Sequence, residues 1–128
     1  MTKEIIEKFL ERAEGFIRDA TYDLENKRFD LAMVHVEQAI QLILKAKLLD
    51  LIGFFPKTHS LVTLIDRILE IEKVEELKKI KEDNYYLLRR IEDAYFLGRY
   101  YLVEFDEKEV KESINLYFRI RGILWKKK

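Results

Sequence analysis

The stretch Arg28–Leu61, RFDLAMVHVEQAIQLILKAKLLDLIGFFPKTHSL, decides the fold of this chain. It begins as the longest strongly apolar helical segment of the sequence and contains its only proline, Pro56. On a helical wheel its broad apolar face is accompanied by a second apolar stripe. A helix with two apolar faces needs two sets of neighbours: the core of a bundle, plus either another helix or a second subunit. The second stripe consists of Met33, Ile40, Leu44 and Leu51.

Composition narrows the class of protein. At 128 residues the chain is long enough for one domain with a single core, and we expect it to form one domain over residues 1–128. It has no cysteine, which excludes disulfides and thiolate metal sites, and its formal net charge is zero. No apolar run approaches the roughly 18 residues of a membrane span. The N-terminus lacks the pattern of a signal peptide, so we expect a cytoplasmic protein without membrane contact.

Charged residues make up 38% of the chain, and glutamine, asparagine and cysteine are scarce. This balance is typical of proteins from thermophiles. Among the charges, Lys plus Arg equals Asp plus Glu, which argues against a general attraction to nucleic acid or to an anionic membrane. Local basic patches remain compatible with this balance.

Apolar residues recur at helical spacing along the whole chain, and no segment alternates like a strand. A first helix starts near Thr2, Asn26–Arg28 forms a turn, and the apolar second helix ends at Gly53. Glu37, Gln38, Gln41 and Lys45 gather on the remaining, polar side of that second helix.

Later boundaries follow from capping signals. Thr58 or Ser60 can cap a third helix, and Asp106 with Glu109 matches a capping box for the last helix. Residues 70–82 read as a short surface helix or a loop, and a fourth long helix is expected from about residue 83 to 101. The pattern predicts an all-α, up-and-down helical bundle of four to five helices.

Several kinds of chemistry are absent from the sequence. Its four glycines are isolated, so there is no phosphate-binding glycine loop. No Glu-x-x-His or His-Glu-x-x-His pair is present, and we expect no metal site and no cofactor. Ser60 next to His59 is a poor nucleophile pair, because neighbours on a helix point about 100° apart.

The two histidines carry the candidate chemistry. Arg28 and His35 are seven residues apart and therefore nearly in register on one helix face. An arginine that stabilises a phosphate and a histidine that moves a proton would suffice for metal-free RNA cleavage, although His35 is also a reasonable core or interface residue. His59 lies near the start of the third helix, where anions are favoured, and Lys45 and Lys57 can share its neighbourhood.

Aromatic residues surround arginines on the fourth helix. Such a group can stack bases and bind phosphates, or it can form a dimer interface. We favour the interface, because exposed aromatic side chains on a small bundle need covering. The residues assigned to it are Tyr86, Arg90, Phe96 and Tyr100.

Three segments together resemble the HEPN family, small all-α domains named for higher eukaryotes and prokaryotes nucleotide-binding. The second helix carries Gln38-Ala39 and Lys45-Ala46, like the family's central helix. The loop PKTHSLVTLI is similar to the family's Thr-His segment, and AYFLGRYY is similar to its late Arg-Tyr motif with Arg99 and Tyr100. The resemblance spans nearly the whole chain.

The resemblance implies a bundle that dimerises and is often encoded beside a minimal nucleotidyltransferase, as in a toxin–antitoxin pair. Many members are RNases with an arginine followed four to six residues later by a histidine. Here no histidine follows Arg99. The leading hypothesis is therefore a non-catalytic nucleotide-binding or partner-binding protein that uses Lys45, Lys57, His59 and Arg99. The alternatives are a metal-independent RNase toxin, with Arg28 and His35 or with Arg99 and His59, and a purely structural dimerisation bundle.

Overall fold

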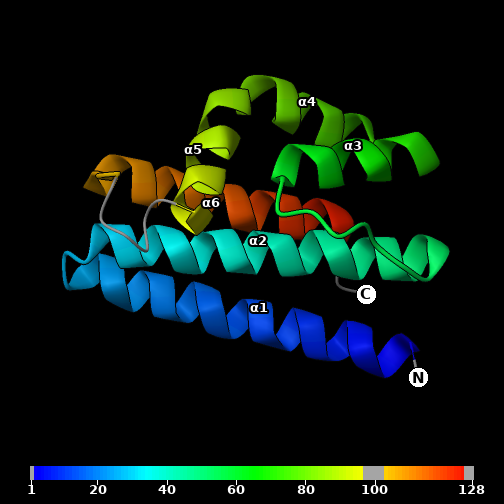
Figure 1. The fold of residues 1–128 in the computed structure, drawn as a ribbon, viewed down its shortest axis with the longest axis horizontal. Helices are drawn as coiled ribbons and strands as arrows, with labels where there is room; N and C mark the ends of the chain where they lie inside the picture. The colour runs from blue at the N-terminus through cyan, green and yellow to red at the C-terminus, as the bar shows by residue number, and fades with distance from the viewer. Residues whose placement is uncertain (1, 97–102, 126–128) are drawn as a thin grey trace.

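A computed structural model describes residues 2–96 and 103–125 of the chain. Within these ranges the fold is entirely helical and contains no strand, which confirms the predicted all-α bundle (Figure 1). The described part holds six helices rather than the expected four to five. They are α1 (Thr2–Glu25), α2 (Phe29–Ile52), α3 (Leu61–Ile71), α4 (Glu75–Asp83), α5 (Tyr85–Phe96) and α6 (Glu107–Leu124).

The helices α1 and α2 form an antiparallel hairpin of two equally long arms, each of 24 residues. The predicted turn between them is present. Lys27 adopts a left-handed conformation with φ of 58°, and the Arg28 N–H donates to the Asp23 carbonyl at 2.8 Å. A left-handed residue just past a helix end is a common way to reverse the chain.

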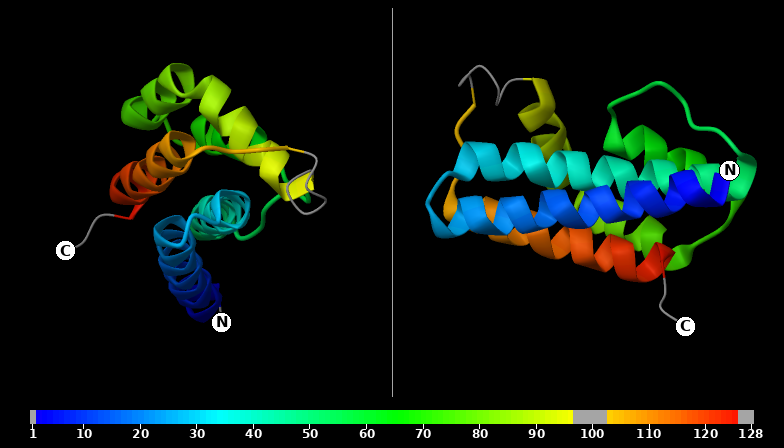
Figure 2. Two further views of the ribbon diagram at one scale, coloured as in Figure 1. Left: turned by 90° about the vertical axis from the view of Figure 1, so that its left-hand side faces the viewer. Right: turned by 90° about the horizontal axis from the view of Figure 1, so that it is seen from below.

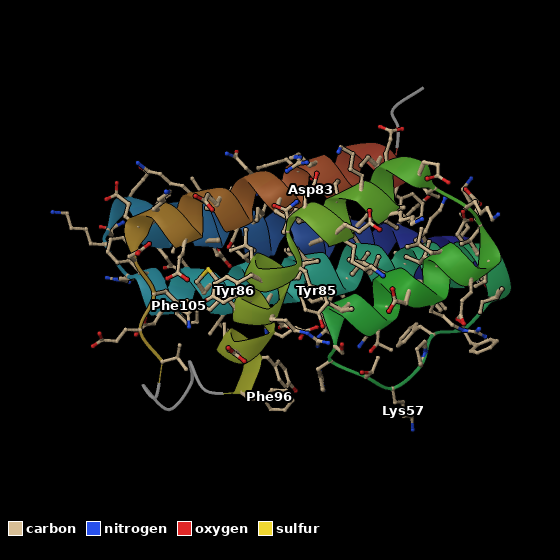
Figure 3. All side chains as sticks on the ribbon, turned by 90° about the horizontal axis from the view of Figure 1, so that it is seen from above. Lys57, Asp83, Tyr85, Tyr86, Phe96 and Phe105 are labelled. Carbon is tan, nitrogen blue, oxygen red and sulfur yellow. The ribbon has the colours of Figure 1, made fainter. Side chains whose placement is uncertain are left out.

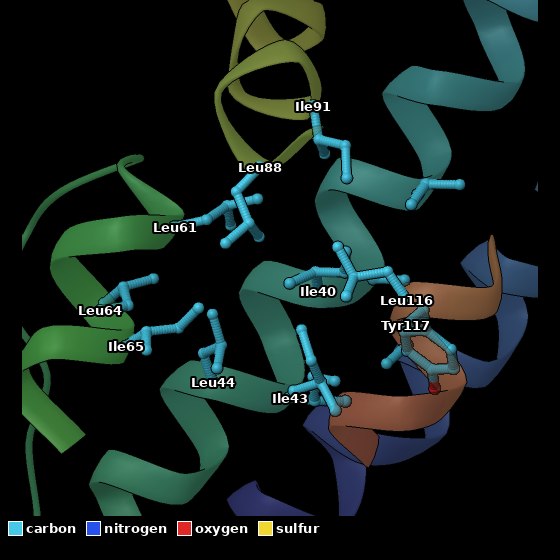
Figure 4. Packing of buried hydrophobic residues seen from close by; sticks show 14 of the residues in the cluster. Ile40, Ile43, Leu44, Leu61, Leu64, Ile65, Leu88, Ile91, Leu116 and Tyr117 are labelled. Atoms are coloured by element: carbon cyan, nitrogen blue, oxygen red, sulfur yellow. The ribbon is translucent and has the colours of Figure 1, made fainter. Parts of the chain in front are cut away.

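The central position of α2 explains its two apolar faces. It packs against α1, α3, α5 and α6, and α6 runs alongside it in the same direction (Figures 1 and 2). Figure 4 shows residues of α2 interlocked with those of α3, α5 and α6. In the second stripe Met33, Ile40 and Leu44 are fully buried by the chain itself. These three residues are therefore core rather than a surface for a second subunit, which corrects one reading of the stripe.

Helix boundaries follow the capping signals. Gly53 ends α2 in the left-handed conformation with φ of 81°, and its N–H donates to the Leu49 carbonyl. The Ser60 hydroxyl accepts a hydrogen bond from the Thr63 N–H and begins α3. At α6 the capping box of Asp106 and Glu109 is complete, with bonds in both directions.

In the middle of the chain the structure has the short helix, rather than the loop, that was expected around residues 70–82. Residues 75–83 form a separate short helix, α4, and α5 begins at Tyr85 and is described only as far as Phe96. The three short helices α3, α4 and α5 arch over one side of α2 (Figure 2). This arch brings the loop before α3 and the end of α5 to the same part of α2, and the candidate site lies there.

Candidate functional site

A polar stripe on α2 forms the floor of a pocket. Glu37, Gln41 and Lys45 follow one another at intervals of four residues, so they lie above each other on one helix face. The sequence grouped them correctly on one side of the helix. However, Glu37 is 0% exposed and Gln41 is 7% exposed, because the loop before α3 and α5 lie near this side of α2. A helical wheel gives no sign of that covering.

Glu37 is the most unusual group in this stripe. Its Oε2 accepts a hydrogen bond from the Gln41 side-chain amide, whereas its Oε1 is buried and has no partner among residues 2–96 and 103–125. Burial raises the pKa of Glu37 to about 7, and Glu92 adds to this effect, while Gln41 and Lys45 act against it. The carboxyl group is therefore about half protonated near neutral pH, and it can either donate or accept a hydrogen bond.

Gln41 joins Glu37 to the loop before α3. Its Nε2 lies 3.1 Å from His59 Nδ1, and it also approaches the His59 carbonyl oxygen at 3.5 Å. An amide nitrogen only donates, so this contact is a hydrogen bond in the tautomer of His59 that carries its ring proton on Nε2. The exposed imidazole of His59 stacks on the half-buried ring of Tyr95, with 3.9 Å between ring centroids and 19° between planes.

Lys45 supplies a positive charge at the same place. Its Nζ lies 5.1 Å from the centre of the Phe55 ring, in the loop that follows α2. Burial lowers the pKa of Lys45, and the nearby Glu37 carboxylate acts in the opposite direction. A lysine that is partly shielded from water interacts more strongly with a bound anion than an exposed one does.

These groups surround a pocket of about 230 Å³, which we call the glutamate pocket. It lies between α1, α2, the loop before α3 and the end of α5. The lining combines aromatic rings, amides, one buried carboxyl group and two cationic side chains. Its residues are Arg12, Phe16, Glu37, Gln38, Gln41, Leu42, Lys45, His59 and Tyr95.

A second buried carboxylate holds the loop that carries His59. Glu92 of α5 accepts hydrogen bonds on Oε2 from the Ser60 hydroxyl at 3.0 Å and from the Val62 N–H at 3.1 Å. Its Oε1 accepts from Arg89 at 2.7 Å. A carboxylate at a helix N-terminus satisfies free amides and favours the helix dipole. Glu92 therefore ties the start of α3 to α5, and this contact positions the neighbouring His59.

The candidate phosphate-binding residues have separate positions. Lys45 and His59 meet in the glutamate pocket. Lys57 is exposed and projects away from the helices (Figure 3). Arg99, the fourth candidate, lies outside the described residues.

The RNase candidates Arg28 and His35 both contact Asp23, Arg28 through its backbone N–H and His35 through its ring. Arg28 is exposed at the start of α2, beside Phe105 and Glu104 of the segment before α6. His35 is half-buried, and its Nδ1 lies 2.7 Å from Asp23 Oδ2. Its ring also stacks on Phe16, with 6.0 Å between centroids. These contacts give His35 a satisfied structural position between α1 and α2.

The predicted interface residues divide into two kinds. Tyr86 is 77% exposed and Phe96 is 53% exposed, and both remain on the surface of this chain (Figure 3). Arg90 makes contacts within the chain: it pairs with Glu109 at 2.8 Å and donates to the Glu104 carbonyl at 2.9 Å. Tyr100, the fourth interface residue, lies outside the described residues.

Metal and membrane chemistry find no support in the described ranges. Across residues 2–96 and 103–125, no group of three or more metal-binding side chains comes together. No helix in the same ranges is long and apolar enough to cross a membrane. What these residues do form is an all-α domain with a small pocket of polar, aromatic and cationic groups.

The comparison with protein families agrees with this class. The model of the HEPN domain matches residues 6–127, which is almost the entire chain. The chain belongs to the HEPN family. No curated protein and no solved structure matches it.

Proposed function

We propose that this chain is a non-catalytic HEPN protein that binds a nucleotide in the glutamate pocket. The observation that carries the proposal is Glu37, which lines a pocket with aromatic and cationic walls and whose buried Oε1 has no partner among the described residues. An unsatisfied buried polar atom costs roughly 1–3 kcal/mol, so a ligand that pairs with it gains that amount. The family is named for nucleotide binding, which is consistent with the chemistry of this lining.

The size of the pocket indicates which part of a nucleotide it takes. Its volume of about 230 Å³ is below the roughly 300–1,000 Å³ of sites for whole small molecules, so we assign it to the base alone. Phe16 and Tyr95 supply aromatic walls to the pocket, and stacking on an aromatic ring contributes roughly 1–3 kcal/mol per base. The Glu37 carboxyl can pair with the polar edge of the base. Lys45 and the exposed Arg12 then supply positive charge to the phosphates.

Titration calorimetry with ATP and with GTP tests this assignment. We expect saturable binding of at least one of them and a roughly tenfold weaker affinity for Gln41→Ala, because this change removes the donor that fixes Glu37 and His59. Gln38→Ala is the matched control, since Gln38 lines the pocket without bonding Glu37 and should change affinity less than threefold. If neither ATP nor GTP gives a binding signal at millimolar concentration, the proposal is wrong.

RNA cleavage without a metal is the second candidate, because Glu37 has a pKa of about 7 and lies in the same network as His59. Groups that titrate near the working pH are suited to proton transfer. We rank it lower, since no histidine follows Arg99 in the sequence. Cleavage of RNA in EDTA that disappears with His59→Ala would reverse this order.

We further propose that the chain forms a homodimer through the exposed rings of Tyr86 and Phe96 and that it acts with a minimal nucleotidyltransferase. The support is the family, in which dimers and such partners are common, and the exposure of both rings. Size-exclusion chromatography with light scattering should give twice the mass of one chain, and Tyr86→Ala with Phe96→Ala should shift it towards the monomer. A wild-type monomer at high concentration would contradict the dimer.

A further inference from the structure

A second hollow, of about 470 Å³, lies between α1 and α6 and shares no residue with the glutamate pocket. We call it the tyrosine hollow. Its volume falls within the roughly 300–1,000 Å³ that is usual for small-molecule sites. The residues around it are Glu14, Ile17, Arg18, Tyr117, Phe118, Arg121, Gly122 and Trp125.

Two hydrogen-bond donors at this hollow are buried and unused. Tyr117 is 1% exposed, yet its hydroxyl reaches no partner among the described residues. Figure 4 shows its ring at the edge of the core, with the oxygen turned away from Ile40. The Nη1 of Arg121 is likewise buried without a partner. Buried polar groups in folded proteins are nearly always paired, so two donors without a partner among residues 2–96 and 103–125 favour an added acceptor at this hollow.

The charges around the hollow favour an anionic acceptor. Arg121 uses its Nη2 to pair with Glu14 Oε1 at 3.3 Å, which leaves the buried Nη1 without a partner among the described residues. Arg18 is exposed at the same hollow, so two cations face one carboxylate. Burial raises the pKa of Tyr117, with Arg121 acting against it, and the phenol therefore remains a donor at neutral pH. The carbonyl end of α6 opposes an anion, but its effect is weaker than that of a guanidinium in contact.

The rest of the lining is apolar and held in place. Trp125 donates its indole N–H to the Ile43 carbonyl at 3.2 Å, so its polar atom is satisfied and its ring is fixed. Phe118 lies edge-on to Tyr117 with 5.1 Å between centroids, and its side chain is 55% exposed. With Ile17 these rings offer an apolar wall beside the two donors.

We propose that the tyrosine hollow binds a small organic carboxylate with an apolar body. The carboxylate oxygens accept hydrogen bonds from the Tyr117 hydroxyl and from Arg121 Nη1, and the apolar body packs on Phe118 and Trp125. A charge-assisted pair of this kind needs an acceptor with two oxygens, which a carboxylate provides. This site is independent of nucleotide binding in the glutamate pocket.

The chain contains a single tryptophan, and it lines this hollow, so intrinsic fluorescence reports on the site. Titration with 4-phenylbutyrate should change the Trp125 emission saturably. The neutral 4-phenylbutanamide, with the same apolar body, should bind at least tenfold more weakly. The protein is the full chain in both titrations.

Three variants distinguish a hollow that binds 4-phenylbutyrate from one that holds only water. Tyr117→Phe should weaken 4-phenylbutyrate binding about tenfold without lowering the melting temperature, because it removes an unused buried hydroxyl. Gly122→Leu should fold and block the hollow, since no atom lies within 4 Å of a Cβ at Gly122. Arg119→Met is the matched control, as Arg119 lies on α6 but lines a different hollow, and its affinity should remain that of wild type.

Three outcomes would overturn the proposal. They are the absence of saturable binding at millimolar 4-phenylbutyrate, equal binding of the acid and the amide, and unchanged affinity in Tyr117→Phe. Each would show that the hollow holds only water or offers only an apolar surface.

Discussion

Replacing Glu37 by glutamine should make the protein more stable than wild type at pH 8 and leave it equally stable near pH 4.5. Burial raises the folded-state pKa of Glu37 to about 7, from its ordinary value of 4.5. Folding therefore takes up a proton between these two pH values. The stability that depends on this proton is fully present below the unfolded pKa and is lost as pH rises through the folded pKa.

The size of the effect follows from the shift. A difference of this size in pKa corresponds to about 3 kcal/mol of unfolding free energy, as an order of magnitude. Glutamine has the shape of a protonated glutamate and can still accept a hydrogen bond from Gln41. The difference between variant and wild type should thus grow from near zero at pH 4.5 to its full value by about pH 8.

Urea unfolding followed by circular dichroism, at pH values from 4.5 to 8, measures this difference. Glu107→Gln is a control in which the free energy of unfolding should change with pH in the opposite direction. Lys111 lowers the pKa of the exposed Glu107, so the loss of this carboxylate should remove stability at high pH rather than at low pH. A constant difference between Glu37→Gln and wild type across the range would show that Glu37 is ionised in the folded protein.

The fold could be predicted from the sequence because its signals are local. The left-handed cap at Gly53, the hydroxyl cap at Ser60 and the capping box at Asp106 each involve residues at most four positions apart. The two apolar faces of α2 likewise indicate its central position in the bundle. The number of helices was less certain, because α4 is short and charge-dense, and its two buried side chains, Leu77 and Ile80, are only three residues apart.

The site was only partly predictable because its contacts are not local. His59 and Lys45 were identified from their own chemistry. The sequence indicates only that Glu37 and Gln41 lie on the polar side of α2. Their burial depends on a contact between Gln41 and His59, which lies 18 residues further along the chain, and the sequence of α2 does not reveal this contact. Arg90 was assigned to an interface for the same reason, since its partner Glu109 lies 19 residues further along the chain.

Two lysines that are equivalent by sequence should behave differently in nucleotide binding. Lys45 and Lys57 were both candidate phosphate ligands, but only Lys45 lines the glutamate pocket, while Lys57 is exposed and directed away. We expect Lys45→Met to lower ATP affinity tenfold or more, since charge-assisted hydrogen bonds contribute roughly 1.5–3 kcal/mol. Lys57→Met should change it less than twofold, because an exposed charge at a distance is screened by salt.

The same pair also tests the electrostatics of the pocket. Removing Lys45 takes away a charge that lowers the pKa of Glu37, so the carboxyl group should become harder to ionise in Lys45→Met and remain unaltered in Lys57→Met. Methionine keeps most of the apolar stem of lysine, so the packing near Phe55 should persist and thermal unfolding should confirm a folded variant. Calorimetry with ATP at 0.15 M salt then compares the two variants directly. If both lose affinity equally, Lys45 has no larger role than the exposed Lys57, and the ligand does not occupy the glutamate pocket as proposed.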